Sequence, residues 1–222
     1  MTKKKRALIY AAIVACVIVV DQVVKILVKT NMHIGEDIPI IGNWCHLHFI
    51  ENEGFAFGMA FGGAAGKIFL TLFRIFATGV IAWLIWKQLK GNGRTSLIAS
   101  LALIFAGAIG NLIDSCFYGL IFNESFYNVS TMFPPEGGYA PFLQGKVVDM
   151  FYFPLVDFYW PEWIPIIGGK YFEFFSAIFN VADATITIGV IWLIIELAFL
   201  APKAQKTAVE EKKSDAEVVE NK

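Results

Sequence analysis

The segment LIASLALIFAGAIGNLID, residues 97–114, decides how this chain folds. Its apolar length approaches the roughly 20 residues that cross the hydrocarbon core of a bilayer. Small side chains recur every four residues along it, and small residues at this interval let membrane helices approach closely. The stripe ends in polar side chains, so that end is expected to face the interior of a helix bundle. Its members are Ala102, Ala106, Gly110 and Asp114, with Gly107 and Asn111 on the adjacent ridge.

Three further apolar stretches predict a polytopic membrane protein. They cover about Ala7–Val28, Ile68–Trp86 and Ser176–Leu200, in a chain of 222 residues that is 57% hydrophobic and only 17% charged. This composition is typical of membrane proteins. We therefore predict an all-α membrane protein built on a four-transmembrane-helix bundle, with residues 1–202 as the membrane domain. The charged residues 203–222 contain no aromatic side chain and predict a disordered tail.

The distribution of basic residues predicts the orientation of the bundle. Basic side chains precede the first span, lie between the second and third spans and follow the fourth. They are Lys3–Arg6, then Lys87, Lys90 and Arg94, then Lys203 and Lys206. Because basic residues are retained on the cytoplasmic side, both termini and the loop at 87–96 are expected in the cytoplasm. The longer loops, about 29–67 and 115–175, would face outward.

The two outer loops differ in character. In the first, the β-branched and aromatic runs Ile38–Ile41 and Trp44–Ile50 flank a Gly-Asn pair and predict a small hairpin-like β layer. In the second, Val147–Trp163 is rich in aromatic residues, which collect at membrane interfaces, so we expect it to lie on the outer leaflet. Cys45 and Cys116 both face outward and could pair, but their spacing does not require it.

Four carboxylates lie in or beside the apolar stretches, all near the outer ends. An ionisable group in a membrane segment is costly, so each is a functional-site hypothesis. Asp21 and Lys25 share one helix face and predict a structural ion pair. Asp114 ends the small-residue stripe, and Asp149 lies in the aromatic segment. Asp183 is placed about two turns inside the fourth span, on one face with Asn180.

This arrangement favours acid–base chemistry. Two carboxylates in a setting of low dielectric constant share one proton, since both cannot comfortably ionise side by side. The ionised member can then activate a water while the other protonates a carbonyl oxygen. Two alternatives are a proton-coupled transporter with an aspartate relay and an assembly factor whose polar residues only hold helices together. The aspartates cluster at one face and do not form a chain across the bilayer, which argues against the transporter.

Five segments, in order, resemble the motif blocks of lipoprotein signal peptidase, also called signal peptidase II. They are DQVVK (21–25), NEGFAFG (52–58), GNLID (110–114), VVDMF (147–151) and FNVAD (179–183). The resemblance implies a bacterial inner-membrane aspartic peptidase without a metal or other cofactor. Such an enzyme cleaves prolipoproteins just before their diacylglyceryl-modified cysteine. Its expected partners are membrane lipid, these precursors and globomycin-type peptide inhibitors, with no nucleic acid, and we expect a monomer.

The resemblance also implies roles for single residues. The family's catalytic dyad falls on Asp149 and Asp183. The positions near its active site fall on Asn52, Gly54, Asn111, Asp114 and Asn180, and its first block on Asp21 and Lys25. The first outer loop would be the family's extracytoplasmic β-cradle, and the segment around Asp149 would lie beside an extracytoplasmic helix.

The chain departs from the family pattern in two respects. The family usually has Arg after the aspartate of its third block, where this chain has Ser115. Arg74, unusual inside the second span, is predicted to pair with Asp114 and restore that charge. The second outer loop is also longer than typical, so Asn123–Gln144 and Pro154–Lys170 are interpreted as insertions. They could form a lid or partner surface, or be tolerated surface loops.

Overall fold

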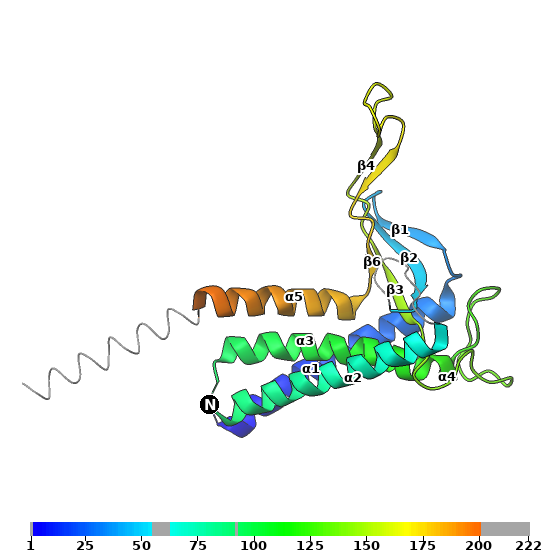
Figure 1. The fold of residues 1–222 in the computed structure, drawn as a ribbon. Coiled ribbons are helices and arrows are strands. Elements are labelled where there is room, and N and C mark those ends of the chain that lie inside the picture. The colour runs from blue at the N-terminus through cyan, green and yellow to red at the C-terminus, as the bar shows by residue number, and fades with distance from the viewer. Residues whose placement is uncertain (1, 55–62, 92, 201–222) are drawn as a thin grey trace, which may run out of the picture.

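The computed structural model describes residues 2–54, 63–91 and 93–200. Within them, four helical segments are long and apolar enough to cross a membrane, so the predicted four-span bundle is confirmed. Their helices lie side by side (Figure 1): α1 (Lys3–Asn31), α2 (Gly63–Lys90), α3 (Thr95–Ile113) and α5 (Val181–Ile195). A π-helical turn, Asp114–Tyr118, and the short α4, Gly119–Ile121, extend α3, and a second π-helical turn, Glu196–Leu200, extends α5. The predicted tail at 203–222 lies outside the described residues.

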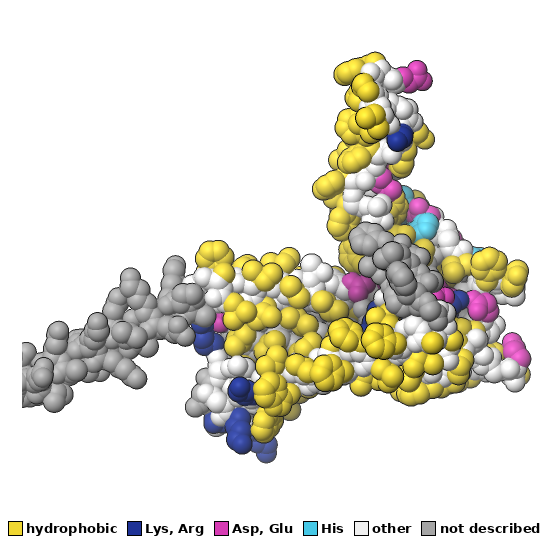
Figure 2. All heavy atoms as spheres, viewed as in Figure 1, with side chains coloured by type: hydrophobic (Ala, Val, Ile, Leu, Met, Phe, Trp, Pro, Cys, Tyr) yellow, Lys and Arg dark blue, Asp and Glu magenta, His cyan; other side chains and the backbone are white. Residues whose placement is uncertain are grey.

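The small-residue stripe of α3 brings three helices together. Ala102, Ala106 and Gly110 are buried. A Cβ atom added at Gly110 would lie 2.6 Å from Asp21 Oδ2 on α1 and 3.1 Å from the Ala182 Cβ on α5. Only glycine therefore lets both neighbours approach α3 at this level, as the sequence predicts. Away from these contacts the helices expose many apolar side chains, which cover most of the bundle surface in Figure 2.

A four-stranded antiparallel sheet stands at one end of the bundle (Figure 1). Its order is β1 (Asp37–Ile41), β2 (Cys45–Asn52), β3 (Val147–Tyr152) and β6 (Ile178–Phe179). The predicted hairpin is confirmed as β1 and β2. β3 comes from the second long loop and pairs with β2, placing Asp149 opposite Ile50. A core cluster packs the sheet against the ends of α1 and α3: Val28, Met32, Phe49, Tyr118, Phe122, Val148 and Met150.

The two proposed insertions adopt different structures. Pro154–Lys170 contains β4 (Val156–Tyr159) and the turn that leads to β5 (Tyr171–Phe174), which follows it. The two strands form a separate ribbon that projects from the sheet across the direction of the helices (Figure 1). Asn123–Gln144 is an irregular loop whose Tyr139 packs against the core cluster and whose Ser125 and Ser130 are buried. The insertion at 154–170 therefore projects, and the insertion at 123–144 is docked on the body of the protein.

Three expectations are wrong in detail. The fourth helix begins at Val181 and not at Ser176, because the chain first pairs with β3 as β6. The segment around Asp149 is a strand, and no helix occurs between residues 122 and 180, all of which the structure describes. Val147–Met150 are buried within the protein, since β2 and the core cluster cover them, so this part does not lie on lipid.

Candidate active site

Asp149 is the more enclosed of the two aspartates predicted to form the dyad. It lies on β3 with only 2% of its surface exposed. Asn52 Nδ2, on the neighbouring β2, donates to Asp149 Oδ2 at 3.1 Å, and Asn180 Nδ2 donates to Oδ1 at 2.6 Å. Each carboxylate oxygen therefore has an amide donor, as a buried carboxyl group requires.

Asp183 lies in the first turn of α5, nearer the helix end than predicted. The Asn180 side chain accepts from the Asp183 backbone N–H at 2.9 Å, and Asp183 Oδ2 accepts from the Asn180 N–H at 3.4 Å. These reciprocal bonds form a capping box, which satisfies N–H groups that a helix start leaves free. The prediction misplaced Asp183 because it counted the strand residues before Asn180 as helix.

Asn111 connects the two aspartates. Its Nδ2 donates to Asp183 Oδ1 at 2.7 Å, and its Oδ1 accepts from Asn180 Nδ2 at 3.1 Å. Since Asn180 also binds Asp149, a chain of amides runs from one carboxyl group to the other. Both aspartates line one cavity of about 240 Å³, together with Asn52, Gly54, Arg74, Asn111 and Val147.

The pKa of Asp149 is strongly shifted. Burial, followed by the negative charge of Asp183, raises the pKa of the Asp149 carboxyl to about 7, although hydrogen bonds from Asn52 and Asn180 act in the opposite direction. A carboxyl group with a pKa of about 7 is about half protonated at neutral pH, so it can supply a proton to a reaction in which an ionised partner accepts one.

Lys25 is the centre of a buried charge cluster behind the cavity. Its Nζ lies 3.0 Å from Asp21 Oδ2 and 2.8 Å from Asp114 Oδ2, and it donates to Asn111 Oδ1 at 2.8 Å. The predicted Asp21–Lys25 pair is thus present, but Lys25 also binds α3. Asp21 Oδ1 accepts from the Ala182 N–H at 2.8 Å, so the cluster also holds the first turn of α5.

Asp114 holds the strand of Asp149 in place through a backbone contact and is not a partner of Arg74. Its Oδ2 accepts from the Val148 N–H at 3.3 Å, one residue before Asp149, and its Oδ1 accepts from Gln22 Nε2 at 2.9 Å. Lys25 supplies its counter-charge. The sequence did not indicate this role for Gln22, although Gln22 lies inside the first motif block.

Arg74 lines the cavity, but it does not pair with Asp114 as predicted. Nη1 donates to Ser115 Oγ at 3.0 Å, and Nη2 donates to the Gly54 carbonyl oxygen at 3.1 Å. Gly54 has a φ of +91°, and a Cβ atom there would lie 2.7 Å from Arg74 Nη2, so glycine fits this position. Arg74 thus lies beside the residue where the family usually has Arg. Phe55–Gly58 of the second block lie outside the described residues.

A second polar cluster was not predicted. Lys29 is fully buried, and its Nζ contacts Glu51 Oε1 and donates to Ser125 Oγ at 2.7 Å. Burial alone would raise the pKa of Glu51, but Lys29, Ser125 and Lys146 together hold that pKa below the usual value. Lys29 follows Asp21 and Lys25 at intervals of four, so its helix face was the available signal.

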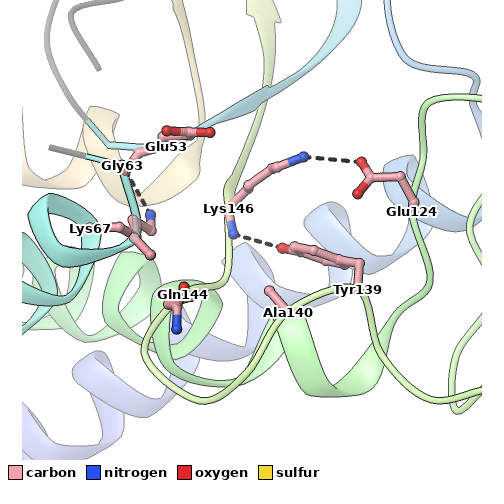
Figure 3. Close-up of a pocket in the computed structure, with 9 residues that line it drawn as sticks. Glu53, Gly63, Lys67, Glu124, Tyr139, Ala140, Gln144 and Lys146 are labelled. Atoms are coloured by element: carbon pink, nitrogen blue, oxygen red, sulfur yellow. Dashed lines mark hydrogen bonds and ion pairs between the residues drawn. The ribbon is translucent and has the colours of Figure 1, made fainter. Parts of the chain in front are cut away.

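Lys146 fixes the docked insertion beside this cluster (Figure 3). Its Nζ lies 3.0 Å from Glu124 Oε1 and 3.4 Å from Glu51 Oε2, and its backbone N–H donates to the Tyr139 hydroxyl at 2.7 Å. Lys146, Glu124 and Tyr139 border a hollow of about 260 Å³ that Lys67 and Glu53 also line (Figure 3). Lys146 directly precedes β3, so the cluster helps to position the strand of Asp149.

The cysteines and histidines of the described residues add no further site. Cys45 and Cys116 are buried and free, so they do not form a disulfide. His46 Nδ1 lies 2.7 Å from Asp37 on the next strand. Among the described residues, no group of three His, Cys, Asp or Glu side chains is placed to hold a metal ion.

Comparison with known proteins agrees with this arrangement. A family model described as signal peptidase (SPase) II matches residues 13–199. The lipoprotein signal peptidase of Porphyromonas gingivalis is 45% identical over 188 residues, which cover 84% of this chain and 81% of that protein. The one from Amoebophilus asiaticus is 37% identical over 199 residues, covering 88% and 79%.

Solved structures agree as well. One described as a bacterial membrane enzyme aligns with a TM-score of 0.55 and 26% identity over 86% of this chain and 92% of its own. A second aligns with a TM-score of 0.54 at the same identity, over 85% and 86%. The extent of these matches, together with the fold, shows that the chain belongs to the signal peptidase II family.

Proposed function

We propose that this protein is an aspartic peptidase that cleaves prolipoproteins just before their diacylglyceryl-modified cysteine, with Asp149 and Asp183 as its catalytic dyad. Family membership supports the removal of signal peptides from prolipoproteins. The observation that carries the dyad is the shared cavity: both aspartates line it, and the amides of Asn111 and Asn180 link them.

In the proposed reaction, Asp183 is ionised and Asp149 is protonated when the peptide binds. Asp183 takes a proton from water as the water oxygen attacks the scissile carbonyl carbon, and Asp149 gives its proton to the carbonyl oxygen. The resulting diol collapses when Asp183 passes its proton to the amide nitrogen, Asp149 takes a proton back from one diol hydroxyl, and the C–N bond breaks. This returns both carboxyl groups to their starting states. The pKa of about 7 at Asp149 supports its assignment as the initial acid.

The other polar residues of the cavity are proposed to position the dyad and the substrate. Asn52, Asn111 and Asn180 hold the carboxyl groups in fixed orientations, and Asp114 holds β3 through Val148. Gly54 offers a backbone close to the cavity where a side chain would obstruct it. A peptide-like inhibitor of the globomycin type would occupy the same cavity.

We further propose that the enzyme lies in the bacterial inner membrane as a monomer, with both termini cytoplasmic and the cavity toward the outer face. The basic residues at the opposite end of the bundle support this orientation. The substrate would then enter laterally from lipid, with its diacylglyceryl chains remaining in the bilayer.

The test is cleavage of a lipid-modified precursor by purified protein in vesicles. Asp149→Asn and Asp183→Asn should each abolish cleavage, because an amide is neither the acid nor the base. Asp157→Asn, on the projecting ribbon, is the matched control and should retain activity. Normal turnover in either dyad variant would refute the assignment, provided that thermal melting shows all three variants folded.

A further inference from the structure

The β4–β5 ribbon has two chemically different faces. Antiparallel pairing places Val156 opposite Phe174 and Phe158 opposite Phe172 on one face. Trp160 extends this face, with its ring 5.0 Å from that of Phe158 and 5.8 Å from that of Phe172. We call Val156, Phe158, Phe172 and Phe174 the apolar face.

The opposite face is acidic. Asp157 pairs with Glu173, and Tyr159 pairs with Tyr171. Like charges directly opposite each other destabilise a strand pair, so they indicate a side that stays in water. Tyrosine hydroxyls contact both carboxylates: Tyr171 donates to Asp157 at 3.2 Å, and Tyr152 donates to Glu173. Period-two alternation thus makes the ribbon amphipathic.

The apolar face has no protein cover among the described residues. Its four side chains are between 37% and 56% exposed, and Trp163 and Ile166 in the connecting turn are 81% and 90% exposed. A contiguous apolar surface of this kind indicates an interaction site. Hydrophobic atoms gather mainly on the side of the ribbon toward which the helices run, and charged atoms mainly on the other side (Figure 2).

We propose that the ribbon is an interfacial membrane contact, whose apolar face rests on the outer lipid surface beside the helix bundle. The ribbon leaves the sheet at the start of α5 and runs across the helix direction, hence along a membrane that the helices span (Figure 1). Its apolar face continues the lipid-exposed surface of the bundle. Its aromatic composition matches the belts found at headgroup level.

The backbone limits how deeply the ribbon enters the bilayer. A two-stranded ribbon has two open edges, and open sheet edges are not tolerated in the hydrocarbon region. The ribbon therefore lies at headgroup depth, where water satisfies the edges, with the aromatic rings directed toward the acyl chains.

Contact of the ribbon with the membrane would orient the candidate active site, because the ribbon directly continues β3, the strand that carries Asp149. Only residues 153–155 separate β3 from β4, and β6, which pairs with β3, follows β5 after residues 175–177. The hydrogen bond from Tyr152 to Glu173 joins the two units. A ribbon held on lipid would thus fix the tilt of β3 against the membrane surface from which the substrate enters.

Spin labels on neighbouring residues test the contact. Phe172→Cys and Glu173→Cys are made in the full chain with its native cysteines replaced by alanine, and the labelled proteins are placed in phosphatidylethanolamine–phosphatidylglycerol vesicles. The label at 172 should collide several-fold more with oxygen than with a water-soluble nickel complex, and the label at 173 the reverse. Equal nickel access at both sites would overturn the proposal. Shielding of label 172 from both reagents would also do so, since it indicates a protein partner.

Activity supplies a second test, which rests on the proposed function. Phe172→Glu should lower kcat/KM several-fold for precursor in vesicles and leave it unchanged in detergent micelles. Tyr159→Glu adds the same charge to the acidic face and should have no effect in either. An equal loss in micelles, or with Tyr159→Glu, would overturn the role in orientation. Failure of the parent enzyme to cleave would instead refute the proposed function and leave the labelling result intact.

Discussion

The ionisation of Asp149 links the geometry of the cavity to pH. In the proposed mechanism Asp149 protonates the substrate carbonyl, and its pKa of about 7 means that this proton is lost as the pH rises through that value. We therefore expect kcat/KM to fall about tenfold per pH unit on the alkaline side, above about pH 7. A pH profile measured in vesicles checks this, and a rate that stays level to about pH 9 would contradict it.

The same shift affects stability with a defined sign. The folded state holds the Asp149 proton up to about pH 7, whereas the unfolded chain releases it near pH 4. Stability from this group is therefore lost as the pH rises between those values. Asp149→Asn cannot ionise, so its melting temperature relative to the parent should increase from pH 5 to pH 8. An unchanged difference would show that Asp149 is not protonated in the folded protein.

Asn180 has two separable tasks, as a helix cap and as a donor to Asp149. Asn180→Ala should lose both stability and activity, with turnover falling roughly ten- to a thousandfold, the range for an oriented polar contact. Asn180→Asp retains a capping oxygen but loses the amide donor, so it should keep the melting temperature better than turnover. Turnover in Asn180→Asp equal to that of the parent would refute the donor role and leave Asn180 as a helix cap only.

The two candidate catalytic aspartates can be picked out from the sequence because their chemistry conflicts with their surroundings. Asp149 and Asp183 stand out in apolar sequence, and the ordered motif blocks name them. The depth of Asp183 was not predictable, since β6 and the first turn of α5 are both apolar. Periodicity alone does not separate a short strand from a helix start.

Among the elements, α1 carries a buried cation, Lys25, that pairs with two carboxylates. Lys25 compensates both Asp21 and Asp114 without contact with solvent. Lys25→Met would leave two buried carboxylates without a cation, and breaking a buried pair costs about 3–5 kcal/mol. We expect a clear loss of thermal stability in detergent, with the exposed Lys5→Met as control. A variant as stable as the control would mean that the carboxylates take up protons without cost.

The contact between α2 and α3 has a different basis. The Arg74 guanidinium, which comes from α2, donates to the Ser115 side chain. It therefore lies beside the position after the third motif block where the family usually has Arg. Arg74→Gln should lower activity, and Ser115→Arg should restore it in the double variant. No rescue, with both variants folded, would show that the Gly54 contact matters more than the charge. The sequence indicated that Arg74 compensates but not its partners, because these depend on the rotation of α2 about its axis.

At the scale of the molecule, the hydropathy pattern predicted the number of spans, and the turn residues predicted the first hairpin. Neither pattern predicted that β3 and β6 would join that hairpin, because this strand pairing connects segments that are far apart in the sequence. The alternation of apolar and polar side chains in 156–159 and 171–174 is visible in the sequence. The direction of the ribbon relative to the helices, however, follows from how the sheet is placed and not from any local pattern.

A last prediction follows from the proposed orientation of the helix bundle in the membrane. Lys90 lies exposed at the end of α2, beside the loop to α3, and Glu136 lies exposed in the docked insertion at the other end of the bundle. In a chain without native cysteines, Glu136→Cys should react with a membrane-impermeant maleimide on intact cells whose outer membrane has been opened. Lys90→Cys should react only after the inner membrane is permeabilised. The basic residues beside Lys90 are the reason, since they oppose transfer of that loop across the membrane. The reverse labelling pattern would place the Asp149 cavity in the cytoplasm, where it would not meet translocated precursors.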